Sequence, residues 1–243
     1  MEQAEMAGRS KDMGSIHPAR AALLVGLLTA GVIFWESPFV YPFKLLAVMG
    51  HETGHALASL AVGGTVDRIS LRADESGQCL SRIPDGFGAR TVVYSAGYVG
   101  SAVIAVLLLV LTFRFNARRL MLGLASAWLA LMGLFYARDA FTLSFCVVMA
   151  VAFGASARWL PSAGVGALNL FIAAFTALYS VIDLKDDLWN RAVRAHSDAQ
   201  LLADATPVPA LVWAGLWTLL SVAVLLAGVG VALKEPQPRG RSR

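Results

Sequence analysis

The chain has 243 residues, of which 57% are hydrophobic and 15% are charged, and its formal net charge is +4 at pH 7. Soluble domains carry about 25% charged residues, so this composition excludes an ordinary soluble domain and indicates a polytopic membrane protein. The basic residues follow the ends of apolar runs, and no basic surface interleaved with aromatic residues occurs. We therefore expect the lipid bilayer, and not nucleic acid, as a partner.

Apolar segments recur along nearly the whole chain and predict one membrane domain. We expect residues 1–19 to form a polar tail, residues 20–233 the membrane-embedded domain, and residues 234–243 a basic tail. Trp35, Glu36 and Pro38 follow the first apolar stretch, where a signal peptide would have small residues and a cleavage site. We interpret this stretch as a retained span of an integral protein, with the cell membrane as its expected location.

Several windows approach the roughly 20 apolar residues that a spanning helix needs. They cover residues 20–36, 40–62, 91–113, 120–136, 139–157, 161–183 and 207–233. We predict an all-α polytopic membrane protein with six or seven transmembrane helices. The positive-inside rule assigns Arg114, Arg118 and Arg119 to the cytoplasm, but three simple crossings would place them outside. This conflict predicts either a miscounted span or a re-entrant helix.

Two polar segments interrupt the spans. The first begins at Thr65, alternates apolar and polar residues on both sides of the sequence ESG, and predicts a short membrane-proximal β-hairpin after the second helix. The second begins at Leu184 and predicts an amphipathic helix, followed by a new helix start near Pro207 and Pro209.

The stretch VMGHETGHALA, residues 48–58, places polar residues inside an apolar run. Residues four apart lie on the same face of a helix, so His51 and His55 can offer imidazole nitrogens to one metal ion. Glu52 is rotated by about 100° around the axis, where its carboxylate reaches a water molecule beside the metal. An ionised carboxylate in a bilayer costs about 2.5–3.5 kcal/mol, which favours a functional reason for its burial. The pattern predicts a zinc site with Glu52 as the catalytic base.

A catalytic zinc ion normally has three protein ligands, so another segment must supply the third. Asp183 ends the apolar run 161–183 and offers a carboxylate at the membrane boundary, which makes it the first candidate. Asp186, Asp187 and Asp198 are the alternatives in the same polar segment. We expect one zinc ion, held by the two histidines and one of these aspartates.

Small residues and one asparagine bear on how the helices pack. The sequence SAGYVGS, residues 95–101, lets backbones approach closely, and we expect this face to pack against the helix with the histidines. Gly54 leaves room for either a substrate backbone or a neighbouring helix. Asn169 is a candidate oxyanion donor, although hydrogen bonding between helices explains it equally well.

These motifs resemble the site-2 protease family of intramembrane zinc metalloproteases, specifically its bacterial peptidase M50B-like branch. The resemblance covers residues 45–215 and is strongest at the histidine motif. It implies a helical core in which His51, His55 and an aspartate hold zinc and Glu52 is the base. It also implies cleavage of a membrane-protein substrate in or near the bilayer. The family's usual aspartate is followed by glycine, and Asp183 is not, so the aspartate alternatives stay open.

Two other classes of function remain as alternatives. A zinc-binding or proton-coupled transporter would line its path with the same polar residues, but the chain shows no internal repeat. A proteolytically inactive scaffold would not need His51, Glu52 and His55 intact. The favoured expectation is amide hydrolysis, in which Glu52 takes a proton from water and returns it to the leaving amine. The edge of the hairpin is a candidate partner for an unwound substrate strand.

Overall fold

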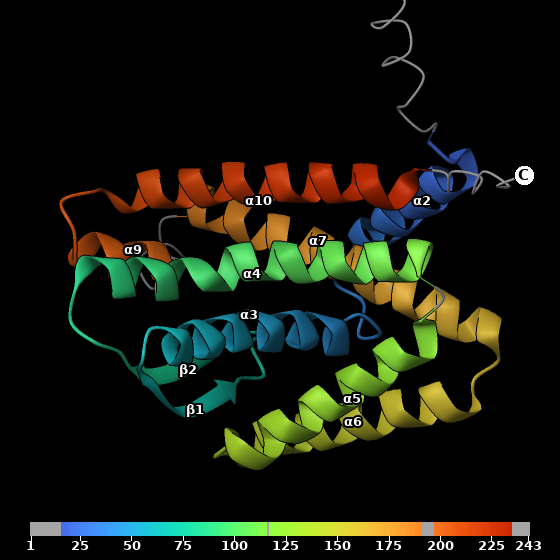
Figure 1. Ribbon diagram of the computed structural model, residues 1–243, viewed down its shortest axis with the longest axis horizontal. Coiled ribbons are helices and arrows are strands. Elements are labelled where there is room, and N and C mark those ends of the chain that lie inside the picture. Colours follow the sequence, from blue (N-terminus) through green and yellow to red (C-terminus); the bar gives the residue numbers. More distant parts are fainter. Residues whose placement is uncertain (1–15, 116, 191–196, 235–243) are drawn as a thin grey trace, which may run out of the picture.

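The computed structural model describes residues 16–115, 117–190 and 197–234, apart from the side chains of residues 186–188. The described elements are α2 (Pro18–Ile33), α3 (Tyr41–Ala61), β1 (Thr65–Leu71), β2 (Gly77–Arg82), α4 (Phe87–Arg114), α5 (Arg118–Phe135), α6 (Ala140–Trp159), α7 (Ser162–Trp189), α9 (Asp198–Asp204) and α10 (Ala210–Leu233). The mostly helical fold with one small hairpin is the predicted class. Figure 1 shows α10, α4 and α3 stacked one above another, with α5 and α6 below them.

Five of the described helices are long and apolar enough to cross a membrane, namely α4, α5, α6, α7 and α10. Helix α2 has only 16 residues, and α3 carries the polar histidine motif. The short helices α5 and α6 are separate because Asp139 caps α6: its carboxylate accepts a hydrogen bond from the backbone N–H of Thr142 at 2.8 Å. All the predicted apolar windows therefore correspond to helices.

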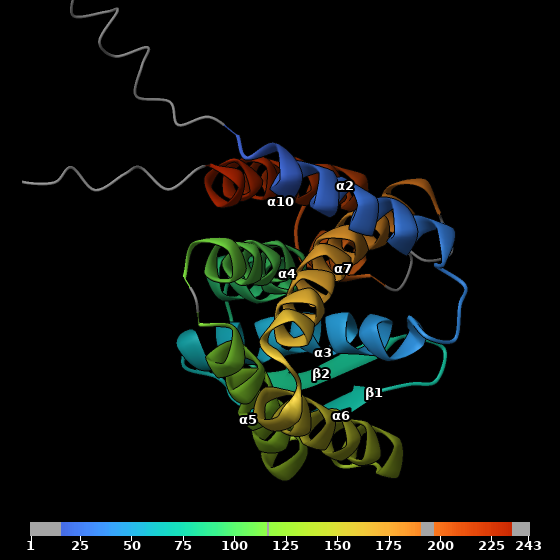
Figure 2. The same cartoon turned by 90° about the vertical axis from the view of Figure 1, so that its right-hand side faces the viewer.

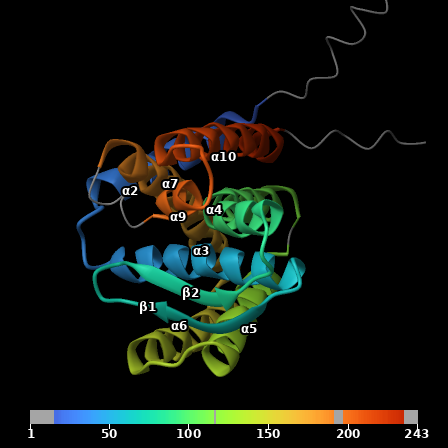
Figure 3. The same ribbon diagram turned by 90° about the vertical axis from the view of Figure 1, so that its left-hand side faces the viewer.

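The predicted hairpin consists of β1 and β2, which pair antiparallel. The outer edge of β1 is tied to the α5–α6 connection, since the N–H of Ile69 donates to the carbonyl of Tyr136 at 3.0 Å. The N–H of Leu71 donates to the Thr142 hydroxyl at 2.8 Å. Figure 3 shows the hairpin between α3 and the α5–α6 pair, with β2 on the side of α3. Both edges of this small sheet therefore meet other parts of the chain.

The course of α2 and α3 bears on the conflict over the basic residues. The N–H of His17 donates to the carbonyl of Leu233, so α2 starts at the end of the bundle where α10 stops. Trp35 stacks on Phe175, near the middle of α7, and so the joint between α2 and α3 lies at mid-depth. Helix α3 then continues to the opposite end, where it meets the hairpin (Figure 1). Figure 2 shows α3 between α4 and the hairpin. Together α2 and α3 cover the length of the bundle once, and this course favours the miscounted span over the re-entrant helix.

Basic side chains gather at the end of the bundle where α2 starts. Arg20 and Arg114 both donate to the carbonyl of Lys234, and Arg119 donates to the carbonyls of Ala157 and Leu160. These side chains satisfy carbonyls that helices α6 and α10 leave open at their C-termini. The hairpin, α9 and the start of α10 lie at the opposite end (Figure 1). The positive-inside rule favours the cytoplasm for the basic end.

This course predicts that the chain crosses the membrane an even number of times between Pro18 and Lys234. Epitope tags inserted before Pro18 and after Lys234 should have the same accessibility to protease added outside sealed vesicles. A tag inserted after Asp85, in the exposed loop before α4, should have the opposite accessibility. Tags at Pro18 and Lys234 that differ in accessibility would contradict the shared traverse of α2 and α3.

Candidate metal centre

The histidine motif forms two consecutive turns of α3 in the interior of the protein. The side chains of Glu52 and His55 are almost completely buried, and that of His51 is mostly buried. The two imidazole rings stand edge to face with their centroids 4.7 Å apart. This is the arrangement predicted from the spacing of four residues, because side chains at that spacing share a helix face.

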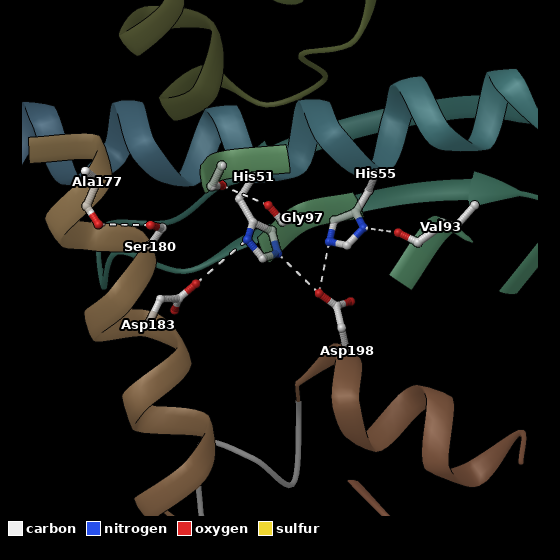
Figure 4. A network of polar contacts seen from close by, with 9 residues as sticks. His51, His55, Val93, Gly97, Ala177, Ser180, Asp183 and Asp198 are labelled. Atoms are coloured by element: carbon white, nitrogen blue, oxygen red, sulfur yellow. Dashed lines mark hydrogen bonds and ion pairs between the residues drawn. The ribbon is translucent and has the colours of Figure 1, made fainter. Parts of the chain in front are cut away.

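Asp198, the first residue of α9, brings a carboxylate to both imidazoles. Its Oδ2 atom lies 3.2 Å from Nε2 of His51 and 3.0 Å from Nε2 of His55, as Figure 4 shows. Burial alone would raise the pKa of the Asp198 carboxyl, but the adjoining His55 and His51 hold this pKa below its usual range. The deprotonated carboxylate is the form that metal ions bind.

The other ring nitrogens also have partners. Nδ1 of His55 lies 2.7 Å from the carbonyl oxygen of Val93 in α4. Because a carbonyl only accepts, this nitrogen carries the proton, and Nε2 of a neutral His55 then presents a lone pair. Nδ1 of His51 lies 3.7 Å from Oδ2 of Asp183 in α7. Protein metal sites commonly orient imidazole ligands through outer partners of these two kinds.

Three side chains thus meet the requirements of a metal site. One ligand atom each from His51, His55 and Asp198 lies within 4.8 Å of the other two, so the three can hold one metal ion. Two imidazoles and a carboxylate suit zinc in a catalytic site, where a fourth position stays open for water. The lone pair on His55 and the charged carboxylate of Asp198 point to the same place, which fits a divalent cation.

The aspartates predicted as candidate ligands lie at different positions relative to the two histidines. The structure groups Asp198 with the two histidines and places Asp183, the first candidate, beside the far nitrogen of His51. The side chains of Asp186 and Asp187 lie outside the described residues. The sequence ranked Asp183 first because it ends the apolar run 161–183, and it did not distinguish the three aspartates that follow.

Glycines allow α3 and α4 to approach each other at the site. A Cβ atom on Gly54 would lie 2.5 Å from the carbonyl oxygen of Ala96, so this glycine makes room for a neighbouring helix. A Cβ atom on Gly97 would overlap the imidazole of His51. The expected packing of the SAGYVGS face on the histidine helix is confirmed, and Gly97 contributes directly to the position of one imidazole.

The hairpin covers the Glu52 side of the motif. A Cβ atom on Gly77, the first residue of β2, would lie 2.7 Å from Oε1 of Glu52, so the strand backbone packs directly on this carboxylate. Cys79 follows on the same face of β2. Burial raises the pKa of its thiol to about 12, and the negative charges of Glu52 and Asp198 contribute to the increase. The thiol stays protonated near neutral pH and adds no thiolate to the site.

Asn169 lies away from this centre. Its amide group donates to the carbonyl of Arg118 at 2.9 Å and to that of Val165 at 3.0 Å. Arg118 starts α5, at the basic end of the bundle. Asn169 therefore connects α7 with α5, and the interhelical interpretation of this residue is the one that the contacts support.

Comparison with known proteins identifies the family. A family model described as Peptidase M50B-like matches residues 24–228, a range that contains the histidine motif, the hairpin, Asp183 and Asp198. No curated protein and no solved structure matches the chain. Five described helices are long and apolar enough to cross a membrane, in agreement with a membrane-embedded peptidase family. The chain is an integral membrane protein of the metallopeptidase kind and belongs to the Peptidase M50B-like family.

Proposed function

We propose that the protein is an intramembrane zinc metalloprotease that hydrolyses peptide bonds of membrane-protein substrates. The observation that carries the proposal is the meeting of two imidazoles and one carboxylate beside a buried glutamate, within a bundle of apolar helices. The family match supports the same reaction class. We propose His51, His55 and Asp198 as the zinc ligands and Glu52 as the catalytic base.

Each chain residue has a defined task in this proposal. A bound zinc ion would supply Lewis acidity, which polarises the scissile carbonyl and makes water more acidic. Glu52 accepts one proton from the attacking water and delivers it to the nitrogen of the leaving amine. The water oxygen first bonds to the carbonyl carbon, and the C–N bond then breaks as the nitrogen is protonated, so water and the amide give a carboxylic acid and an amine. Asp183 orients His51, and the carbonyl of Val93 orients His55.

Buried surroundings strengthen these electrostatic interactions. Glu52 has 7% of its surface exposed and His55 has 6%, so little water competes with their contacts. Charge–charge interactions are several-fold stronger in such an environment than in bulk water. A substrate helix in lipid has all its backbone groups paired, so it must unwind locally before Glu52 and the metal can act on an amide.

We expect Glu52→Gln to abolish proteolysis while leaving zinc bound, because the amide cannot accept a proton yet does not alter the ligands. Cleavage of co-expressed, tagged single-span membrane proteins would be followed by the size of the fragments, and zinc would be measured by mass spectrometry of the purified protein. Glu36→Gln, a change of the same kind at an exposed residue, should cleave like the unmodified protein. A transporter would cleave no probe in any of the three forms.

The two nearby aspartates should differ in their effect on zinc. We expect Asp198→Asn to remove a ligand and to leave the purified protein largely free of zinc. Asp183→Asn should retain zinc at an affinity reduced about 10–100-fold, the range typical of outer partners of ligand histidines. Titration with zinc in competition with a chelator would measure both affinities. A larger loss for Asp183→Asn than for Asp198→Asn would assign the third ligand to Asp183.

Gly97 and Gly100 provide a matched pair on α4. Gly97→Ala should displace the imidazole of His51 and reduce the zinc content, because the new methyl group occupies the space of the ring. Gly100→Ala should retain zinc, since its Cβ atom would lie 3.8 Å from Cα of Gly54, which is ordinary contact. Equal zinc content in the two variants would show that α4 can move away from His51 without loss.

A further inference from the structure

A buried lysine on α3 has no task in the proposed reaction. Lys44 lies two helical turns before His51 and is only 4% exposed. Its ammonium group lies 3.1 Å from each carboxylate oxygen of Glu75 and 4.7 Å from the centre of the Trp35 ring. Lysine is rarely buried without a partner, and inside a membrane protein such a residue calls for an explanation.

Glu75 lies in the turn of the hairpin and adopts an unusual backbone conformation. Its φ angle is +68°, in the left-handed region that residues other than glycine seldom occupy. The ion pair with Lys44 stabilises this turn on α3. A second contact acts beside it, since the hydroxyl of Tyr41 donates to the carbonyl of Ala73 at 2.9 Å. The start of α3 therefore holds the turn of the hairpin through two side chains.

The anchored hairpin turn is followed at once by the strand residue that packs on Glu52, the proposed catalytic base. Gly77 follows Glu75 by two residues and packs on the carboxylate of Glu52. Val48, which lies between Lys44 and Glu52 on α3, also contacts Gly77 closely. The position of the turn along α3 therefore determines where the backbone of Gly77 presses on Glu52.

We propose that the Lys44–Glu75 ion pair is a positioning element for catalysis: it anchors the hairpin on α3 and thereby orients the Glu52 carboxylate for proton transfer. Lys44 is a positioning residue, because it contacts neither the ligands nor the reacting atoms. The role rests on the proposed proteolytic function and adds a specific requirement to it. A cation at residue 44 is needed for turnover but not for metal binding.

Lys44→Met keeps the length and apolar stem of the side chain and removes its charge. The variant should bind zinc like the unmodified protein, and its kcat for a single-span probe in detergent should fall at least tenfold, with KM within twofold. Lys44→Arg, which keeps the cation, should retain at least half of kcat. Glu75→Gln should lower kcat like Lys44→Met, because it breaks the same pair from the other side.

Hydrogen exchange provides a second measurement that does not depend on activity. Backbone amides of residues 72–82 should exchange at least tenfold faster in Lys44→Met, while those of α4 remain unchanged. Arg82→Met is the control: its ion pair with Asp67, at 3.1 Å, belongs to the same hairpin but is largely exposed. It should alter neither exchange nor kcat, since exposed ion pairs contribute little.

The outcomes separate the two proposals. Unmodified protein that cleaves no probe contradicts the proteolytic function. Unmodified protein that cleaves, together with Lys44→Met at the same kcat, contradicts only the positioning role. Faster exchange in Lys44→Met with unchanged kcat also overturns that role, because the anchor would then stabilise the hairpin without orienting Glu52.

Discussion

The contact of Asp198 with two imidazoles is the interaction on which the site depends. Asp198 and His51 are separated by 147 residues in the chain, yet their side chains meet at 3.2 Å. Each of these groups would be unfavourable alone in an apolar bundle, because a buried charge or polar atom without a partner loses its hydration. Together they compensate one another, and a divalent cation among them would do so more completely. The meeting also fixes α9 against α3, which connects the last third of the chain to the histidine helix.

Close helix packing makes this meeting possible. The carbonyl of Val93 can reach His55 only because α4 lies against α3, and that approach requires the missing side chains of Gly54 and Gly97. Glycine lowers the stability of a helix interior by about 1 kcal/mol relative to alanine. In this bundle the penalty is offset because the close approach of α4 lets the carbonyl of Val93 form a hydrogen bond with the imidazole of His55. The same glycines make the site sensitive to the addition of a single methyl group.

Local patterns in the sequence predicted most of the fold, because each depends on neighbouring residues. The apolar windows, the hairpin around ESG and the shared face of His51 and His55 all follow from periodicity. Which aspartate meets the two histidines depends on how the chain folds back toward α3 after α7, and this could not be predicted. Helix α7 continues beyond Asp183 to Trp189, so Asp183 approaches His51 from within α7. Asp198 belongs to a different helix, α9. No pattern in one sequence encodes that return.

The joint between α2 and α3 and the buried ion pair of Lys44 were not predicted, for the same reason. Counting apolar residues treats each window as a full crossing. In the structure the 16-residue α2 and the 21-residue α3 instead follow each other along one length of the bundle, with Trp35 stacked on Phe175 at their joint. Lys44 lies inside the apolar window 40–62, and its partner Glu75 lies in the hairpin turn, 31 residues further along the chain. A single charge in such a window indicates an unseen partner, since an unpaired ammonium would be expelled from lipid.

The side chains at the candidate metal centre differ in how much of their surface is exposed. The Asp183 side chain is 35% exposed, those of Asp198 and His51 are 15% and 12% exposed, and that of His55 is 8% exposed. The site is therefore most exposed at Asp183 on α7 and most enclosed beneath the hairpin. In the proposed reaction, water entering past Asp183 would meet the proposed metal ligands before it meets Glu52. The hairpin closes the opposite side and packs on Glu52. In the proposed reaction this gives the proposed base a dry environment, where proton transfer to the leaving amine faces least competition from bulk water.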